Sequence, residues 1–176
     1  LHVKYVSDPA FPLITHYNMV LGYYRAQDDF GKVFELIDKI KNGGAVNLNY
    51  RSYYFYLDSL KQKRMSNKIL EIAGECAVKV LQTWKKDQVT PSDHFSYIGI
   101  LTAGLEVLSN NLSTIEVDDK NVDDVTLHFE MLLVIMKAMQ TTGFNTKCPY
   151  IDLAINVCNK LLQYPGKESN FDVFYS

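Results

Sequence analysis

Apolar residues recur in the first quarter of the chain at the spacing of one helix face. Two such stripes follow each other between residues 14 and 44, separated by the acidic pair Asp28-Asp29. Their members are Tyr17, Val20, Leu21 and Tyr24, and then Phe30, Val33, Phe34, Ile37 and Ile40. Intervals of three and four residues predict amphipathic helices, and Gly43-Gly44 ends the second stripe with a helix stop signal. This segment is therefore predicted to form two antiparallel helices joined by a short turn.

The pattern of paired helices then repeats along the chain. Residues 50–62 resemble the first stripe and residues 66–84 supply a longer partner, after which Pro91 marks a boundary because proline does not continue a helix interior. The rest is expected to contain a third pair from about residue 93, an exposed, poorly ordered Asn/Asp-rich loop over 109–124, and helices over 125–141 and 150–162. No segment alternates in the manner of a strand. The chain is predicted to be all-α.

The spacing between equivalent helices predicts the architecture. Tyr17 and Tyr53 each lie at the start of the first helix of a pair, and 53 minus 17 places them 36 residues apart. Helix pairs with a period in the mid-thirties are typical of solenoids, in which each pair buries its apolar face against its neighbours. We therefore expect a right-handed superhelical array of antiparallel helix pairs, an α-solenoid.

Composition narrows the class of function. The 176 residues are 47% hydrophobic, and the formal net charge of −2 argues against a generic binder of polyanions. That charge is unevenly distributed, because residues 1–92 carry 13 basic against 9 acidic side chains (+4) and residues 93–176 carry 5 against 11 (−6). The longest apolar run, Met131 to Met136, is about a third of the ~20 residues that a membrane-spanning helix needs. No membrane span is predicted.

The residues that usually carry catalysis form no recognisable constellation. The four histidines (His2, His16, His94, His128) are scattered, and the sequence contains no nucleophile elbow, phosphate-binding loop or zinc-protease motif. Three widely spaced cysteines (Cys76, Cys148, Cys158) predict no disulfide framework. The acidic residues of the 109–124 loop lack the spacing of a calcium loop. We expect a non-catalytic protein without a cofactor or a metal.

One stretch resembles a known repeat family. The run from Pro12 to Gln27 (PLITHYNMVLGYYRAQ) is similar to the first helix of a pentatricopeptide repeat, with a Thr/Tyr/Asn-type start followed by aliphatics, a glycine and an aromatic. The run from Phe30 to Gly44 is similar to the second helix with its closing Lys-x-x-Gly. Tetratricopeptide repeats, a neighbouring family, would want tryptophan, Gly-x-x-Tyr and terminal proline positions that this unit lacks.

The resemblance implies a domain organisation. Repeat 1 would span about 14–49, repeat 2 about 50–92 and a divergent repeat 3 with an insertion about 93–145, before a terminal helix at about 150–163. The match is specific over repeat 1 and partial elsewhere. All 176 residues would form one helical-repeat domain, expected to be a fragment of a longer chain. Divergence of this kind resembles the fungal mitochondrial members of the family, which implies a location in the mitochondrial matrix.

The family reads one RNA base per repeat, through a residue of the first helix and the last residue of the repeat. In repeat 1 these positions fall on Asn18 and Asn49, and the position that sandwiches the base falls on Thr15. An amide pair offers both donors and acceptors to the edge of a base. In the family such a pair resembles a pyrimidine reader that prefers cytosine.

In repeat 2 the corresponding positions depart from the family pattern. The reader falls on Tyr54, the sandwiching residue on Arg51 and the closing residue on Ser92. Tyr54 is larger than the usual small polar reader, so Arg51 and Tyr54 are expected to stack on bases without choosing among them. Nothing is carried over to repeat 3.

Two functions follow as expectations. The first is non-catalytic binding of single-stranded RNA, a mitochondrial transcript or ribosomal RNA, in RNA maturation or stability, translational activation or a ribosome-associated role. The second is a helical-repeat scaffold that binds protein within a larger assembly through the acidic second half. Basic side chains gathered on the first helices of successive pairs would favour RNA, whereas an apolar groove would favour a protein partner.

Overall fold

The structure is a computed structural model that describes residues 12–85, 88–143 and 149–165. Within these ranges the protein contains seven α-helices and no strand, so the all-α prediction is confirmed. The helices are α2 (Leu13–Ala26), α3 (Phe30–Gly43), α4 (Tyr50–Gln62), α5 (Ser66–Thr83), α6 (Pro91–Leu112), α7 (Val122–Thr141) and α8 (Pro149–Leu162). No helix in the described part of the chain is both long and apolar enough to cross a membrane.

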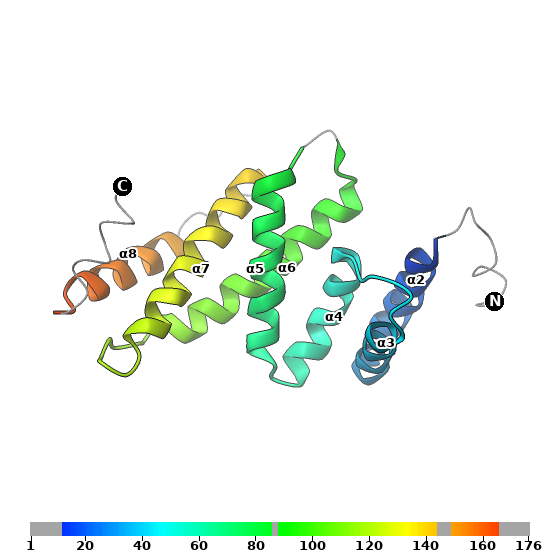
Figure 1. Ribbon diagram of the computed structural model, residues 1–176, viewed down its shortest axis with the longest axis horizontal. Helices are drawn as coiled ribbons and strands as arrows, with labels where there is room; N and C mark the ends of the chain where they lie inside the picture. The colour runs from blue at the N-terminus through cyan, green and yellow to red at the C-terminus, as the bar shows by residue number, and fades with distance from the viewer. Residues whose placement is uncertain (1–11, 86–87, 144–148, 166–176) are drawn as a thin grey trace.

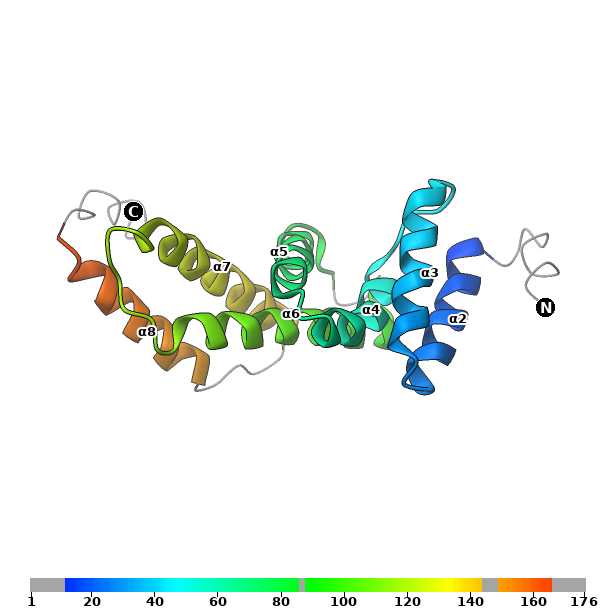
Figure 2. The same cartoon turned by 90° about the horizontal axis from the view of Figure 1, so that it is seen from below.

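The helices follow one another along the long axis of an extended molecule, from α2 at one end to α8 at the other (Figures 1 and 2). Each helix packs on the next one in sequence. Further contacts skip one helix, joining α2 to α4, α4 to α6, α6 to α8 and α5 to α7. The result is a packed helical bundle with sequential contacts, in which the superhelical winding of the expected solenoid stays a prediction.

The first helix pair forms as its pattern predicts. The Asp29 side chain caps α3 by accepting a hydrogen bond from the Lys32 backbone N–H at 3.2 Å, and such caps stabilise a helix by about 1 kcal/mol. At the other end of α3, Gly44 adopts a left-handed conformation with φ of 65°, which costs glycine nothing. Leu21 and Ile37 are fully buried on the facing stripes. Sequence and structure agree here on two antiparallel helices.

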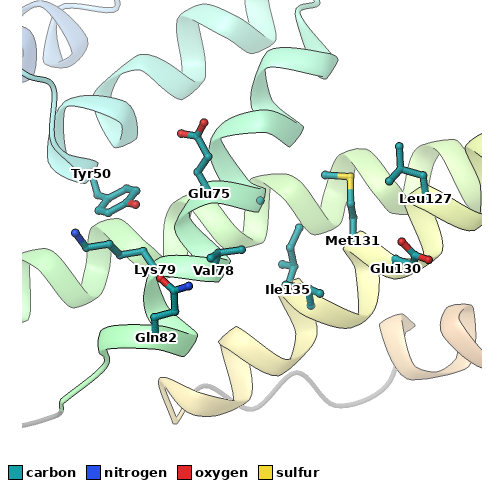
Figure 3. A pocket seen from close by; sticks show the side chains of 11 residues that line it. Tyr50, Glu75, Val78, Lys79, Gln82, Leu127, Glu130, Met131 and Ile135 are labelled. Atoms are coloured by element: carbon teal, nitrogen blue, oxygen red, sulfur yellow. The ribbon is translucent and has the colours of Figure 1, made fainter. Parts of the chain in front are cut away.

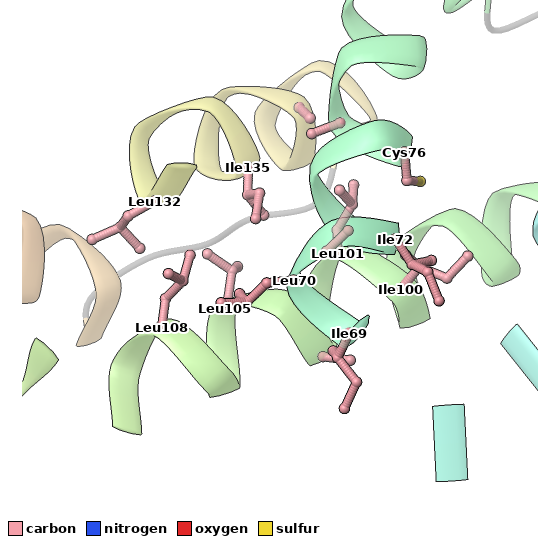
Figure 4. Close-up of a cluster of buried hydrophobic side chains, with 14 of the residues drawn as sticks. Ile69, Leu70, Ile72, Cys76, Ile100, Leu101, Leu105, Leu108, Leu132 and Ile135 are labelled. Atoms are coloured by element: carbon pink, nitrogen blue, oxygen red, sulfur yellow. The ribbon is translucent and has the colours of Figure 1, made fainter. Parts of the chain in front are cut away.

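The largest part of the core lies where α5, α6 and α7 meet (Figure 4). Cys76, Leu101, Leu105, Leu132 and Ile135 are fully buried there. At the crossing of α5 and α6 a β-carbon on Gly104 would collide with the Ala73 side chain. This glycine is therefore what lets the two helices approach so closely.

The predicted loop over 109–124 is too long. Helix α6 continues to Leu112, which is fully buried, and α7 already begins at Val122. Burial of these apolar residues outweighs the weak helix propensity of the neighbouring asparagines. Pro91 was predicted only as a boundary, but in the structure it is part of the first turn of α6. Proline is tolerated there because the backbone N–H groups of a first turn have no partner within the helix.

The remaining loop is held by its own side chains, and the expectation of a poorly ordered insertion is wrong. The Asp118 carboxylate accepts hydrogen bonds from the backbone N–H groups of Lys120 and Asn121, at 2.8 and 2.9 Å. Lys160 of α8 donates to the Ile115 carbonyl at 2.6 Å, and the Tyr164 hydroxyl contacts the Asp119 carboxylate. Short polar side chains thus make the turn and fasten it to α8.

Candidate nucleic-acid interface

The two predicted base-reading amides lie side by side and bond to each other. Asn18 Nδ2 donates to Asn49 Oδ1 at 3.0 Å, and the Ser52 hydroxyl donates to Asn18 Oδ1 at 2.6 Å. The same Asn49 oxygen caps α4, because it accepts from the Ser52 backbone N–H at 3.1 Å. We call Asn18, Asn49 and Ser52 the amide cluster. It joins the middle of α2 to the first turn of α4.

The burial of Asn18 limits the hydrogen bonds that the amide cluster can make to a ligand. The Asn18 residue is only 5% exposed, whereas Asn49 is exposed. An incoming base would have to replace the hydrogen bonds that Asn18 makes inside the protein, which are costly to leave unmade. The reader role therefore stays a prediction. Ser52 was missed in the sequence, although the Asn-x-x-Ser spacing of a capping box could have pointed to it.

The other predicted RNA contacts take no part in the hydrogen bonds of the amide cluster. Thr15, in the first turn of α2, and Arg51, in the first turn of α4, are both exposed. Ser92 falls in the first turn of α6, but its side chain lies outside the described residues. The helical interval of three residues places Arg51 on the same face of α4 as Tyr54.

Tyr54 of α4 contacts side chains from both α2 and α6. The guanidinium carbon of Arg25 in α2 is 4.8 Å from the centre of the Tyr54 ring, and Arg25 Nη2 donates to the Tyr54 hydroxyl at 3.4 Å. Phe95 of α6 meets the same ring edge-on at a centroid distance of 5.4 Å, and it is 65% exposed. We call Tyr54 and Phe95 the aromatic platform. Phe95 was missed because only the fold places it beside Tyr54.

The aromatic platform borders a groove of about 240 Å³ between α4 and α6. Two basic residues line this groove, and each is neutralised by an acid. Arg25 Nε lies 3.0 Å from Asp58 Oδ2, and Lys61 Nζ lies 3.7 Å from Glu106 Oε2. The side chains of both pairs are about a third to a half exposed, so each pair adds little stability. The same weakness makes both cations available to a competing anion.

Three other basic residues of the first half, Lys41, Lys63 and Lys68, do not line this groove. Lys41 at the end of α3 lies close to Lys68 at the start of α5, and its pKa is lowered, first by burial and then by the charge of Lys68. Lys63 packs on Phe34, with its Nζ 4.5 Å from the ring centre. These cations belong to the second helices of their pairs or to the turn between α4 and α5. The positive balance of the first half is thus divided between at least two surfaces.

Nothing among the described residues forms a group of three or more side chains suited to hold a metal ion. Of the cysteines, Cys76 is buried, and burial raises the pKa of its thiol to about 12. Cys158 is partly buried, while Cys148 lies outside the described residues, as does His2. In the acidic 109–124 segment, the Asp118 carboxylate accepts backbone hydrogen bonds and stabilises the turn described above.

The comparisons with family models, with curated proteins and with solved structures found no match to this chain. The resemblance to pentatricopeptide repeats therefore rests on the residues quoted for it in the sequence.

Proposed function

We propose that this protein is a non-catalytic, helical-repeat binder of single-stranded RNA. The observation that carries the proposal is the aromatic platform, which combines an exposed ring at Phe95 with the cations Arg25 and Lys61 beside it. Aromatic side chains that stack on bases, together with cations that track the phosphates, are the common means of binding single strands. The cations come from α2 and α4 and the rings from α4 and α6, as expected when first helices line one RNA path.

The binding mode follows from the same contacts. A base stacks on Phe95, and phosphates compete with Asp58 and Glu106 for the two cations, so affinity is modest and falls with added salt. Stacking does not select a base. Choice among bases requires Asn18 to exchange its partners in the amide cluster for the edge of a base.

The wider setting is proposed on the resemblance. The chain would be a right-handed array of divergent pentatricopeptide-like pairs in the mitochondrial matrix, acting on a transcript or ribosomal RNA in mitochondrial gene expression. The contacts that join α2 to α4 and α4 to α6 support this repeat arrangement. Cell fractionation of the complete, epitope-tagged protein tests the location.

A titration of labelled poly-C, poly-U and poly-A by fluorescence anisotropy, at low and moderate salt, tests the RNA proposal. Loss of one stacking side chain should cost about 1–3 kcal/mol per base, so Phe95→Ala is expected to weaken binding of all three RNAs. Ile155→Ala, at an exposed apolar position of α8, is the matched control and should not change the affinity. Absence of binding by the wild-type protein at low salt would refute the proposal.

A protein-binding scaffold is the second candidate function. The observation that favours it is an apolar groove of about 600 Å³ between α5 and α7 (Figure 3). The acidic second half of the chain would supply the rest of such an interface.

A further inference from the structure

The groove between α5 and α7 has apolar walls that the described part of the chain leaves open. Leu127, Met131 and Val134 line one wall at intervals of four and three residues along α7, and Val78 stands on the α5 wall (Figure 3). Leu127 is 53% exposed and Val78 is 47% exposed. Gly74 lines the groove without a side chain and lies next to Met131, whose methyl group would be 3.6 Å from a β-carbon at this position. Apolar side chains at this spacing accept the apolar stripe of a helix laid along the groove.

Charged side chains on the two walls indicate which helix fits. Glu75 on α5 and Glu130 on α7 both line the groove, and Lys79 is the basic residue there. Among the described residues none of these three charges has an ion-pair partner. Two carboxylates, one on each wall, against one ammonium group leave the lining of the groove with a formal charge of −1. Complementary charge gives an interface its partner choice.

We propose that this groove binds an amphipathic helix of a partner protein, whose apolar stripe is flanked by lysine or arginine. Anionic ligands such as RNA or acidic lipid are repelled by Glu75 and Glu130. A second copy of this chain would bring its own acidic half, which carries 5 basic against 11 acidic residues, to the same two carboxylates. This proposal specifies the partner of the second candidate function. It is independent of the proposed RNA binding, which uses a different groove, between α4 and α6.

The test is a selection of displayed, stapled helical peptides, with randomised exposed positions, against the wild-type protein. Peptides that also bind the Val78→Asp, Leu127→Asp double variant are removed. The expected survivors carry an apolar stripe with basic flanks.

Single substitutions in the groove then test the selected peptides. Loss of a central apolar contact costs about tenfold or more in affinity, so Val78→Asp and Leu127→Asp should each weaken binding to that extent. Ile155→Asp on α8 is the matched control, since it places the same charge at an equally exposed apolar position. Circular dichroism and thermal melting of all variants establish that they fold.

Reversing the charge of the two glutamates distinguishes a helix with basic flanks from other occupants of the groove. The Glu75→Lys, Glu130→Lys variant should reject the selected peptides and accept versions with glutamate flanks. The proposal is overturned if no peptide survives selection, or if survivors bind equally well with either flank charge. Self-association of the wild-type protein that Leu127→Asp abolishes would assign the groove to a second copy. Peptide binding seen only after shortening the chain to end at Pro165 would assign it to the chain's own last residues. Peptide binding and RNA binding are measured separately on the wild-type protein, so that failure of this proposal can be told apart from failure of the RNA proposal.

Discussion

At the scale of single residues, the amide cluster is compatible with two roles, recognition of an RNA base and stabilisation of the contact between α2 and α4. As a sequence pattern, Asn18 and Asn49 resemble a base reader, a role that stays a prediction. What the pattern could not supply is the partner of each amide, because Ser52 comes into contact with Asn18 only after α2 and α4 pack. In the folded protein the cluster bonds the two helices together.

The first prediction concerns this bond. Asn18→Ala removes one of the two acceptors of the Ser52 hydroxyl and one of the donors to Asn49 Oδ1. At about 0.5–1.5 kcal/mol for each hydrogen bond, the two lost bonds cost about 1–3 kcal/mol. The free energy of unfolding, measured with urea, should fall by that amount. Asn156→Ala, at an exposed position of α8, should change it little. If Asn18→Ala is as stable as the wild type, the amide holds no structural bond and is free to face RNA.

The second prediction concerns pH. Burial raises the pKa of the Cys76 thiol from 9.0 to about 12, and burial together with nearby groups raises the pKa of the Tyr50 hydroxyl from 10.0 to about 12. Both groups ionise more easily in the unfolded chain. The stability that they contribute is therefore complete below pH 9 and is lost as the pH rises toward 12.

Thermal melting at several pH values measures this loss. The melting temperature should fall steeply above pH 9, and the fall should be shallower in Cys76→Ala, which removes the thiol. A melting temperature that stays level up to pH 12 would contradict the raised pKa values.

At the scale of elements, periodicity predicted most of the helices. Helices α4 and α5 lie within a residue of the predicted ranges, because amphipathic spacing reports a buried face directly. The 109–124 segment was misjudged because composition suggests a loop wherever asparagine and aspartate are frequent. Burial of Leu112 and Val122, which depends on contacts with other helices, overrides that tendency.

The third prediction compares Gly104 of α6 with Gly74 of α5. Gly104→Ala places a methyl group against Ala73 at the crossing of α5 and α6, and such overpacking costs about 1–3 kcal/mol. Gly74→Ala meets only an ordinary contact with Met131 and should stabilise α5 by about 0.5–1 kcal/mol, the helix propensity of alanine over glycine. Urea unfolding of both variants checks the opposite signs. Equal effects would mean that propensity alone, and not the close approach, governs both positions.

At the scale of the whole molecule, charge is arranged unevenly in space as well as along the sequence. The dipolar distribution was readable from residue counts, but the pairing of Arg25 with Asp58 and of Lys61 with Glu106 required the fold. These acids lower the positive potential on the face that carries the aromatic platform. We therefore expect the proposed RNA site to bind more weakly than its cations alone would predict.

The fourth prediction follows from these two ion pairs. The double variant Asp58→Asn, Glu106→Gln frees Arg25 and Lys61 for phosphates. RNA affinity at low salt should rise several-fold, and the dependence of affinity on salt should steepen, since about two more cations are free to displace counterions. Anisotropy titrations over a range of salt concentrations measure both. The acidic pair Asp123 and Asp124 on α7, changed to asparagine, is the control for net charge, and an equal gain there would show a general charge effect.

Helices α2 and α3 contact each other and α4, whereas the rest of the bundle is built around α5, α6 and α7. An end unit with so few neighbours opens at a smaller free energy than the whole domain, and opening it separates Asn18 from Asn49 and Ser52. Any base that requires the Asn18 amide therefore binds only the open fraction, and its apparent affinity is reduced by that fraction. Local opening of α2 and α3 would then control any selection among RNA bases by this chain. Hydrogen–deuterium exchange measures that opening, and the backbone amides of α2 and α3 should exchange before those of α6.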